Sequence, residues 1–536
     1  MSSVASEHVW QRIWLGLVLA GSLVTLAAAP LPIIEGDTAL WAQVARNILQ
    51  SGEWLTLHYQ VGWIVDKPPL TFWLMALSLS AIGDNPVALR GWQLLMSLLL
   101  VVVTYLIARL HAGREESLLA ALLLLTFFQV FLQATIPGQD VALTLFLALA
   151  FYEWLRYRRS ARPAAAASTG LWVALAVLTK GPIGLVVFVM VAAADAIVAR
   201  RTRAADQSWR WGHVLLGAAT FAIVATPWFI HGSLRQGFPF VDTFFLRGTI
   251  GFGRFLQPKI AEALPLWQAL LAYVPLLALG MLPWTGVLPA AAREGWRTLR
   301  VGPPALRLCV LWVTAYLVLI SLSLTDKVFR YLLLVYPPLA VVGARALIVG
   351  FNEPRRLRVP AVVTLGIGLP GMAGGIWMTA TRFPQEVEIY LPLVLPFAIT
   401  LALSMVAFAV LTLWRPGRAP FALLAAGTML SFSLLTLDLM TRWEPLWPWQ
   451  RVAAVVHRHH SPATTVVIFR EKIDLPGYYI RVPLTNIDDV SVLSRAWRGG
   501  RTLVLLRNQD LVLLPASPTY RMLTTMPSGW ALVINE

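Results

Sequence analysis

The residues best suited to chemistry in this chain stand in its first polar segment. Asp37 follows the first long apolar run, and Asp66 and Lys67 directly precede a pair of prolines. A carboxylate can accept the proton of an attacking hydroxyl group, and an ammonium group beside a rigid proline turn can bind phosphate oxygens. Structural interpretations stay open as well, because Asp37 can cap a helix and Lys67 can extend to a membrane interface. Glu35 could take the role of Asp37.

Other candidate residues stand near the ends of later apolar segments. The segment ATIPGQD can begin a helix or offer its carboxylate to a polar substrate. The segment FLRGTIGFGRF suits a sugar or phosphate, and suits an interfacial loop almost as well. Together these segments would place cations and acids at one membrane face, as a polar site there requires. The candidates are Asp140 in ATIPGQD, Lys180 in TKGP, Arg247 and Arg254 in FLRGTIGFGRF, and Lys327 and Tyr331 in SLTDKVFRY.

The composition is that of an integral membrane protein. Of the 536 residues, 58% are hydrophobic and 13% are charged, whereas soluble domains have about 25% charged residues. Apolar runs long enough for a spanning helix of about 20 residues recur along the chain. The net charge of +16 does not indicate nucleic acid, because the arginines cluster between alternate apolar segments as topology signals do.

Metal and disulfide chemistry find little support in the sequence. The single cysteine, Cys309, lies inside an apolar run, so a disulfide framework is excluded. His457, His459 and His460 have no carboxylate or cysteine at ligand spacing, which favours a solvated surface. No metal site is predicted, and a divalent cation is the one cofactor left as an open alternative.

The apolar segments predict an all-α polytopic membrane protein. We interpret the first segment as a retained span and not as a signal peptide, since no small-residue cleavage site follows it. The segment Leu70–Ile82 is short for a span and predicts a re-entrant or interfacial helix. The expected spans, about thirteen, are 12–33, 88–109, 116–134, 139–155, 169–180, 182–199, 212–231, 265–290, 306–324, 329–349, 359–380, 390–413 and 420–439.

The loops divide into two sets that differ in their cations. Arginine groups fall in alternate loops, and the positive-inside rule makes that side cytoplasmic. The first loop (residues 34–69), the large loop (residues 232–264) and the C-terminal tail then face outward. Lysine is a compact charge suited to phosphate oxygens, and all five lysines fall on the outer side. They are Lys67, Lys180, Lys259, Lys327 and Lys472.

Two elements outside the spans are expected to position the site. After Asp37, apolar residues recur at helical spacing, which predicts an amphipathic helix with its apolar stripe on the bilayer. From about Arg442, short β-rich segments alternate with turn residues, which predicts a small α/β domain outside the membrane. We therefore expect domains at residues 1–440 and 441–536, with short β-rich segments at 464–469, 477–484, 502–507 and 530–535.

The order of these motifs resembles the membrane glycosyltransferases of the GT-C class. The similarity is greatest to the aminoarabinose transferases of lipid A, and the protein O-mannosyltransferases are more distant. Members have an early Asp-Glu, a Glu-Lys-Pro-Pro turn, a Thr-Lys-Gly-Pro segment, an outer Arg-Phe, a Pro-Trp and a Lys-x-x-x-Tyr. The counterparts here are Asp37, residues 67–69, 179–182, 254–255 and 283–284, and Lys327 with Tyr331.

The resemblance implies a reaction and roles for residues. It implies an inverting transfer of a sugar from a polyprenyl-phosphate (undecaprenyl-phosphate) donor to lipid A, another glycan or a protein. Asp37 would be the general base, and Lys67, Arg254 and Tyr331 would bind the donor phosphate. The residues that would bind sugar or acceptor are Asp140, Asp66, Lys180, Lys327 and Arg247.

The resemblance also implies a location. The protein would be a multi-pass protein of a bacterial inner (plasma) membrane, in contact with membrane lipid. The active site and the C-terminal domain would be periplasmic.

Four residues depart from the family pattern. Leu40 stands where an arginine is common, Asp66 replaces a glutamate, and Arg330 replaces a proline next to Tyr331. Gly251 stands where some members have a histidine, so the Glu/His zinc site of that group is not expected here. These departures concern the sugar and the acceptor more than the fold or the reaction class.

Other function classes fit parts of the sequence. A transporter or flippase of lipid-linked sugar would place ionisable groups near the middle of the membrane, whereas here they stand at the ends of spans. A ligase or polymerase that uses polyprenyl diphosphate would not require the early Asp and Lys-Pro-Pro loop. A protein O-mannosyltransferase-like enzyme is the alternative nearest in chemistry.

Overall fold

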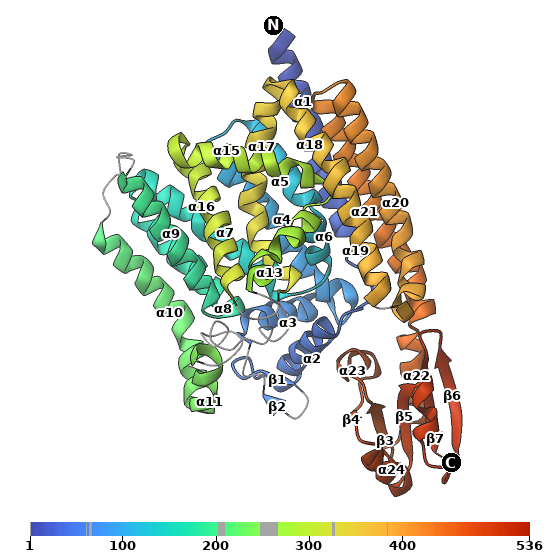
Figure 1. The fold of residues 1–536 in the computed structure, drawn as a ribbon. Coiled ribbons are helices and arrows are strands. Elements are labelled where there is room, and N and C mark those ends of the chain that lie inside the picture. Colours follow the sequence, from blue (N-terminus) through green and yellow to red (C-terminus); the bar gives the residue numbers. More distant parts are fainter. Residues whose placement is uncertain are drawn as a thin grey trace.

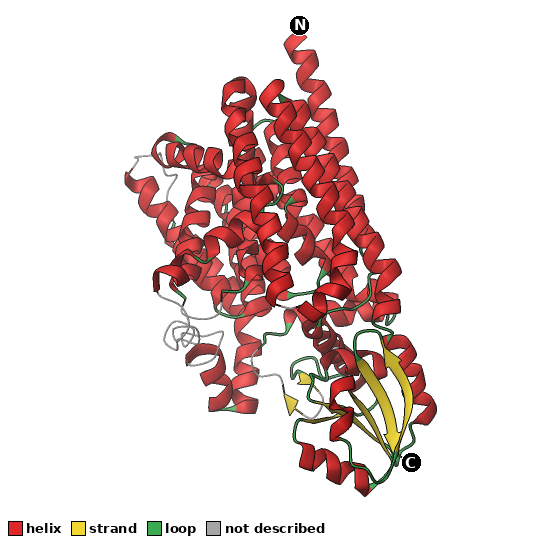
Figure 2. Ribbon diagram, turned by 45° about the vertical axis from the view of Figure 1, so that its right-hand side comes forward, coloured by secondary structure: helices red, strands yellow, loops and turns green. Residues whose placement is uncertain are grey.

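The structure is a helical bundle with a small α/β unit at one end (Figures 1 and 2). This computed structural model describes residues 2–59, 62–63, 67–201, 210–246, 266–323, 327–382 and 384–535. The N-terminus lies at the end of the bundle away from the α/β unit, which contains the C-terminus. The predicted fold class, an all-α membrane protein with a small C-terminal α/β domain, is confirmed.

Most predicted spans are helices of membrane-crossing length. In the described part of the chain, ten helices are long and apolar enough to cross a membrane, or twelve if each of two bent pairs is one span. The unbent ones are α1 (Ser2–Ala27), α4 (Pro86–Arg109), α8 (Pro163–Lys180), α9 (Ile183–Arg201), α10 (Trp211–Gln236), α16 (Pro304–Leu322), η3 with α17 (Phe329–Val335, Tyr336–Asn352), η4 with α18, η5 and α19 (Pro354–Leu357, Arg358–Val363, Thr364–Gly368, Leu369–Arg382), α20 (Pro384–Trp414) and α21 (Arg418–Leu446).

Helix α7 (Gln139–Ser160) corresponds to the predicted span at 139–155, although it is not among these twelve. It has Asp140 in its first turn and Arg158 and Arg159 in its last turn, and most side chains between them are buried. The helix thus carries an acid at one end of the bundle and arginines at the other.

Two predicted spans are bent rather than straight. Helices α5 (Arg114–Thr126) and α6 (Phe128–Thr135) meet at 62°. The segment predicted as one span at 265–290 contains α13 (Leu266–Leu271) and α14 (Tyr273–Gly280), after which the chain turns by 116° into η2 (Trp284–Val287) and α15 (Leu288–Val301). Pro283, which has no backbone N–H, stands at that break.

The helix that begins next to Glu35 is confirmed as α2 (Gly36–Ser51), but its apolar side does not face the bilayer. It packs on α3 (Leu70–Ile82), where the rings of Trp41 and Phe72 lie 6.1 Å apart, edge to face. Trp41, Val44 and Ile48 are buried in the main core. The predicted contact with lipid is wrong because α3 folds back against α2 and covers the apolar stripe.

The C-terminal unit is a mixed sheet between helices. The strand order is β4-β3-β5-β7-β6, with β3 parallel to β4 and β5, and β7 antiparallel to its neighbours. Alternate side chains of β3 and β5 pack on α22 on one face and on α24 on the other, as the two-residue period of a strand requires. The elements are α22 (Trp449–His459), β3 (Thr465–Phe469), α23 (Asp474–Ile480), β4 (Thr485–Ile487), α24 (Val490–Gly499), β5 (Thr502–Arg507), η6 (Asn508–Leu513), β6 (Tyr520–Met526) and β7 (Trp530–Asn535).

Three of the four predicted β-rich segments in this unit are confirmed as β3, β5 and β7, and the fourth is wrong. Residues 474–480 form helix α23, and Pro476 stands in its first turn, where a proline is tolerated. The adjacent Tyr478 and Tyr479 resemble a strand by propensity, but their contacts with α2 and α22 decide the conformation. Helix α21 continues to Leu446, past the predicted domain limit at residue 440, so that limit stays a prediction.

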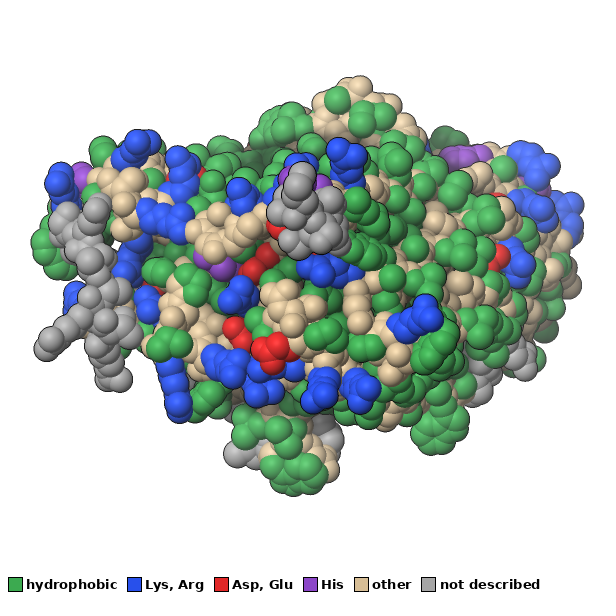
Figure 3. Space-filling view, turned by 90° about the horizontal axis from the view of Figure 1, so that it is seen from above, with side chains coloured by type: hydrophobic (Ala, Val, Ile, Leu, Met, Phe, Trp, Pro, Cys, Tyr) green, Lys and Arg blue, Asp and Glu red, His purple; other side chains and the backbone are tan. Residues whose placement is uncertain are grey.

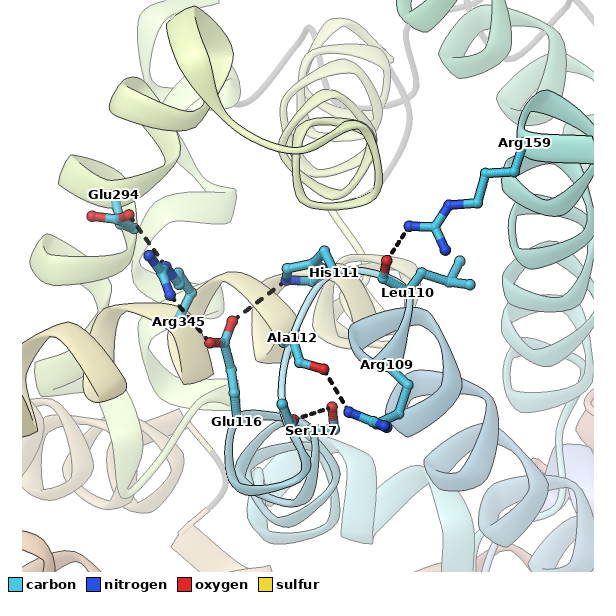
Figure 4. Close-up of polar contacts among 10 residues, drawn as sticks. Arg109, Leu110, His111, Ala112, Glu116, Ser117, Arg159, Glu294 and Arg345 are labelled. Carbon is cyan, nitrogen blue, oxygen red and sulfur yellow. Dashed lines mark hydrogen bonds and ion pairs between the residues drawn. The ribbon is translucent and has the colours of Figure 1, made fainter. Parts of the chain in front are cut away.

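The end of the bundle near the N-terminus carries many basic side chains (Figure 3). Beneath them, buried acids of α5 hold arginines of other helices. Glu115 lies 2.6 Å from Arg418, and Arg345 lies between Glu116, at 3.3 Å, and Glu294, at 3.7 Å (Figure 4). These pairs tie α5 to α15, α17 and α21 at the end opposite to α2.

Helices α8 and α10 approach so closely that only glycine fits between them. A methyl group added to Gly170 would lie 2.0 Å from the carbonyl oxygen of Gly217. Gly170→Ala is therefore expected to lower the free energy of unfolding by about 1–3 kcal/mol, since the helices must separate. Denaturation of the purified protein in detergent measures this.

The matched control is Gly212→Ala in the first turn of α10, where an added methyl group meets nothing within 4 Å. It should be neutral or slightly stabilising, because alanine favours a helix over glycine. Equal stability of the two variants would contradict the close contact of α8 and α10.

Candidate functional site

Asp37 lies in the first turn of α2 and forms an ion pair with an arginine from far along the chain. Its Oδ2 lies 3.1 Å from Nη1 of Arg330, which belongs to η3. The Asp37 side chain is 52% exposed, so it can meet a second molecule. Asp37 is not the N-cap, because that position belongs to Glu35, which makes no side-chain capping bond.

A second ion pair joins the ends of α7 and α8. Oδ1 of Asp140 lies 2.5 Å from Nζ of Lys180, and the Asp140 side chain is only 6% exposed. The Lys180 ammonium also lies 4.7 Å from the centre of the Tyr331 ring, a cation–π distance. The hydroxyl group of Tyr316 donates to the carbonyl oxygen of Tyr331 at 2.9 Å and fixes the backbone there.

The two ion pairs belong to one site because Arg330 and Tyr331 are neighbours in η3. Arg330 faces Asp140 as well as Asp37. Glu35 is close enough to these charges to be affected by them. Burial raises the pKa of its carboxyl group above the usual 4.5, and the negative charges of Asp37 and Asp140 raise that pKa further. Three acids and two cations from four parts of the chain therefore share one region.

The segment that leads into α2 is held from the membrane side by one buried arginine. Arg90 of α4 donates to the carbonyl oxygens of Leu31, Pro32 and Thr135. Thr38 adds a link, since its hydroxyl lies 3.1 Å from Oε2 of Glu35 and 3.2 Å from the Pro137 carbonyl oxygen. These bonds fix the entry to α2 against the end of α6 and the loop before α7.

The predicted site residues are not all placed in this region. Lys327 donates to the carbonyl oxygens of Ile320, Ser321 and Ser323, so it satisfies the free carbonyls at the end of α16. Lys67 lies just before α3, next to the buried Pro68.

Asp66, Arg247 and Arg254 lie outside the described residues. Their assigned roles, and those of Lys67 and Lys327, stay predictions.

No role was predicted for Arg330, the residue that joins the two ion pairs. The sequence pointed to its segment, SLTDKVFRY, as a candidate, and Arg330 itself stood out as a departure from the family pattern. The usable signal was its position next to Tyr331 in SLTDKVFRY, in a chain where most arginines stand in the other set of loops. In the described part of the chain, no three His, Cys, Asp or Glu side chains are placed to hold a metal ion.

Comparisons with solved structures settle the fold. Two structures of ArnT from Cupriavidus metallidurans, each 20% identical in sequence, match 98% of this chain and 98% of their own. The TM-score is 0.77 for the apo state and 0.78 for the form bound to undecaprenyl phosphate. The chain has the fold of ArnT. The GT-C fold expected from the motif order is confirmed.

Sequence comparisons point to the same group as the ArnT fold. Residues 66–231, which include Lys67, Asp140 and Lys180, match the family model described as dolichyl-phosphate-mannose-protein mannosyltransferase. Curated relatives are undecaprenyl phosphate-alpha-4-amino-4-deoxy-L-arabinose arabinosyl transferases. The resemblance to the GT-C aminoarabinose transferases is therefore confirmed.

The matches to these relatives are partial. The Edwardsiella ictaluri protein is 28% identical over 66% of this chain and 63% of its own length. The Sodalis glossinidius protein is 32% identical over 62% of this chain and 58% of its own length. The chain thus spans less than two thirds of the length of these relatives.

The buried Asp140 carboxylate should depend on Lys180 for its stability. Lys180→Met removes the cation and leaves the charge buried, which is expected to cost about 3 kcal/mol, at the low end of such losses because Arg330 also faces Asp140. The double variant Lys180→Met with Asp140→Asn removes both charges and should recover most of the loss. Chemical denaturation in detergent measures both, and a double variant no more stable than the single one would refute the pairing.

Glu35 should make the stability of the protein depend on pH. Its raised pKa means that protonation favours the folded state, so this contribution is complete below about pH 4.5 and is lost as the pH rises through the folded-state pKa. Glu35→Gln removes the ionised form, and its melting temperature relative to the wild type should therefore increase from pH 4 to pH 8. A difference that stays constant with pH would contradict the buried position of this acid.

Proposed function

We propose that the chain is an integral membrane glycosyltransferase. It transfers a sugar from a polyprenyl-phosphate donor, undecaprenyl phosphate in a bacterium, to lipid A or another envelope acceptor, with inversion of the anomeric centre. One observation carries the proposal: the pairs Asp37–Arg330 and Asp140–Lys180 meet around Tyr331 at one end of a bundle with the ArnT fold. The arabinosyl transferase names of the sequence relatives support the same reaction class.

The exposure of the acids suits a displacement at the anomeric carbon. Asp37 is the exposed carboxylate, so it can take the proton of an acceptor hydroxyl while that oxygen bonds to the sugar. The bond from the sugar to the phosphate oxygen breaks on the opposite side, and the polyprenyl phosphate leaves with the electron pair. Arg330 orients Asp37, and the more buried Asp140 and Lys180 hold the wall of the site.

The leaving group needs cations rather than a proton. A phosphate monoester is already a good leaving group, so stabilising its charge is the main requirement. Lys67, Arg254 and Tyr331 are proposed for this role. Attack from the side opposite to the phosphate explains the proposed inversion.

The orientation follows from the charges at the two ends of the bundle. The arginine-bearing end carries the pairs around Glu116 and Arg345 (Figure 4), and the positive-inside rule makes that end cytoplasmic. Helix α2, which carries Asp37, and the C-terminal unit lie at the other end (Figure 1). We therefore place both in the periplasm of a bacterial inner membrane.

A protein O-mannosyltransferase-like activity is the second candidate. The observation that favours it is the family match over residues 66–231, whose description names a protein acceptor. The donor chemistry is the same in both cases, so the choice concerns the acceptor. A transporter of lipid-linked sugar is less favoured, because the charged site lies at the ends of α2, α7 and α8.

The deciding experiment is mass spectrometry of envelope lipids and glycoproteins from cells with and without the gene. A sugar added to lipid A or another glycolipid only when the gene is present supports the first proposal. A sugar added to proteins supports the second. An unchanged set of lipids and proteins, with lipid-linked sugar accumulating on one side of the membrane, would support transport instead.

Asp37→Asn should abolish transfer, with a loss of at least about 100-fold, because asparagine cannot accept the proton. Its side chain has nearly the same size, so expression and membrane insertion should be normal. The measurement is product formation by the purified variant from a polyprenyl-phosphate-linked sugar. Asp488→Asn, in the exposed connection between β4 and α24 of the C-terminal unit, is the matched control and should keep full activity. Turnover near the wild-type rate in the Asp37 variant would exclude this carboxylate as the base.

A further inference from the structure

Helix α23 of the C-terminal unit docks directly on α2, the helix that carries Asp37. Nε2 of Gln43 donates to the carbonyl oxygen of Asp474 at 2.9 Å. The hydroxyl group of Tyr59, in the short strand β1 (His58–Tyr59), which pairs with β2 (Gly62–Trp63), donates to Oδ1 of Asp474 at 2.5 Å. Helix α2 and strand β1 therefore both bind Asp474, the first residue of α23.

Arg46, on the same helix as Asp37, joins three separate segments. Its Nη1 donates to the Tyr478 carbonyl oxygen at 3.1 Å, and its guanidinium lies 4.4 Å from the centre of the Tyr478 ring. Its Nη2 and Nε lie 2.9 Å from the two carboxylate oxygens of Asp84, between α3 and α4. Asp84 is also paired with Arg481, which follows α23, at 3.2 Å. The Arg46 side chain is only 13% exposed, whereas its partner Asp84 is 34% exposed, so the guanidinium is largely covered by the segments that it joins.

Tyr479 holds the segment just before the site. Its hydroxyl group donates to the carbonyl oxygen of Ile33 at 2.9 Å, two residues before Glu35. Burial raises the pKa of this hydroxyl, so it stays a donor over the whole physiological range. Arg90 binds the preceding carbonyls of Leu31 and Pro32 from the membrane side. The entry to α2 is thus held between the bundle and the C-terminal unit.

We propose that the C-terminal α/β unit positions α2 for sugar transfer, and that Arg46 and Tyr479 are positioning residues that act through Asp37. The inference rests on the proposed function. Neither residue belongs to the ion pairs of the site, so their effect must come through the placement of the helix. Misplacing a catalytic group by about 1 Å can cost a factor of about 100 in rate without weakening substrate binding.

The test compares Arg46→Ala and Tyr479→Phe with the wild type and with Arg498→Ala. Arg498 is an exposed arginine in the last turn of α24, so it is matched in chemistry and domain. Two readouts are used on the full-length protein in detergent: kcat and KM for transfer to the acceptor found by mass spectrometry, and hydrogen–deuterium exchange of residues 31–51. The Tyr479 variant loses a single hydroxyl group and should fold even where the Arg46 variant does not.

If Arg46 and Tyr479 position α2, the Arg46→Ala and Tyr479→Phe variants should show faster hydrogen–deuterium exchange in residues 31–51. Their kcat should be about 10- to 100-fold lower, while KM for donor and acceptor stays within about twofold of wild type. Arg46→Lys should recover only part of kcat, because lysine cannot bridge Asp84 and Tyr478 together. The Arg498 variant should match the wild type in both readouts.

Three results would overturn the inference. Unchanged exchange in residues 31–51 would show that the contacts do not hold α2. Faster exchange with an unchanged kcat per folded molecule would show that the contacts stabilise the fold but do not affect catalysis. A raised KM for the acceptor with an unchanged kcat would show that the C-terminal unit binds the acceptor and does not position α2. Absence of transfer by the wild type would instead refute the proposed function, and the exchange readout would still test the docking.

Discussion

The pairing of charges at one end of an apolar bundle is the constraint on which the rest of the structure depends. A carboxylate that is partly withdrawn from water is stable only beside a cation. The buried Asp140 meets this condition through Lys180, and the more exposed Asp37 pairs with Arg330 beside it. The partners are 40 and 293 residues apart in the chain. The ends of α7, α8, α2 and η3 must therefore meet in space, and this requirement fixes the arrangement around the site.

Helix α2 is the element that links this site to the rest of the protein. Its apolar side packs on α3, its entry is bound by Arg90, and its polar side meets α23 of the C-terminal unit. A helix of this length that lay on lipid alone would be free to slide and rotate. Contacts on three sides give Asp37 a defined place, while its side chain keeps the exposure that a reaction with a second molecule needs.

The two ends of the bundle use charge in different ways. At the arginine-bearing end, buried acids of α5 hold arginines of other helices and brace the bundle (Figure 4). At the other end the Asp37 carboxylate is exposed, and a mixed α/β unit covers part of the surface (Figure 2). This polarity fits the proposed transferase, whose lipid-linked donor would lie in the bilayer while the reaction takes place at one surface.

Much of this could be predicted from the sequence, because it depends on local composition. Long apolar runs determine spanning helices, and the order of short motifs identified the GT-C fold. The direction of the spans, inferred from the alternate arginine loops, stays a prediction. Strands β3, β5 and β7 followed from their own residues. Only the tertiary structure decided the rest. The partner of Asp37 is Arg330, the apolar side of α2 faces α3, and Tyr478 and Tyr479 are helical, because each outcome depends on contacts between segments that are distant in sequence.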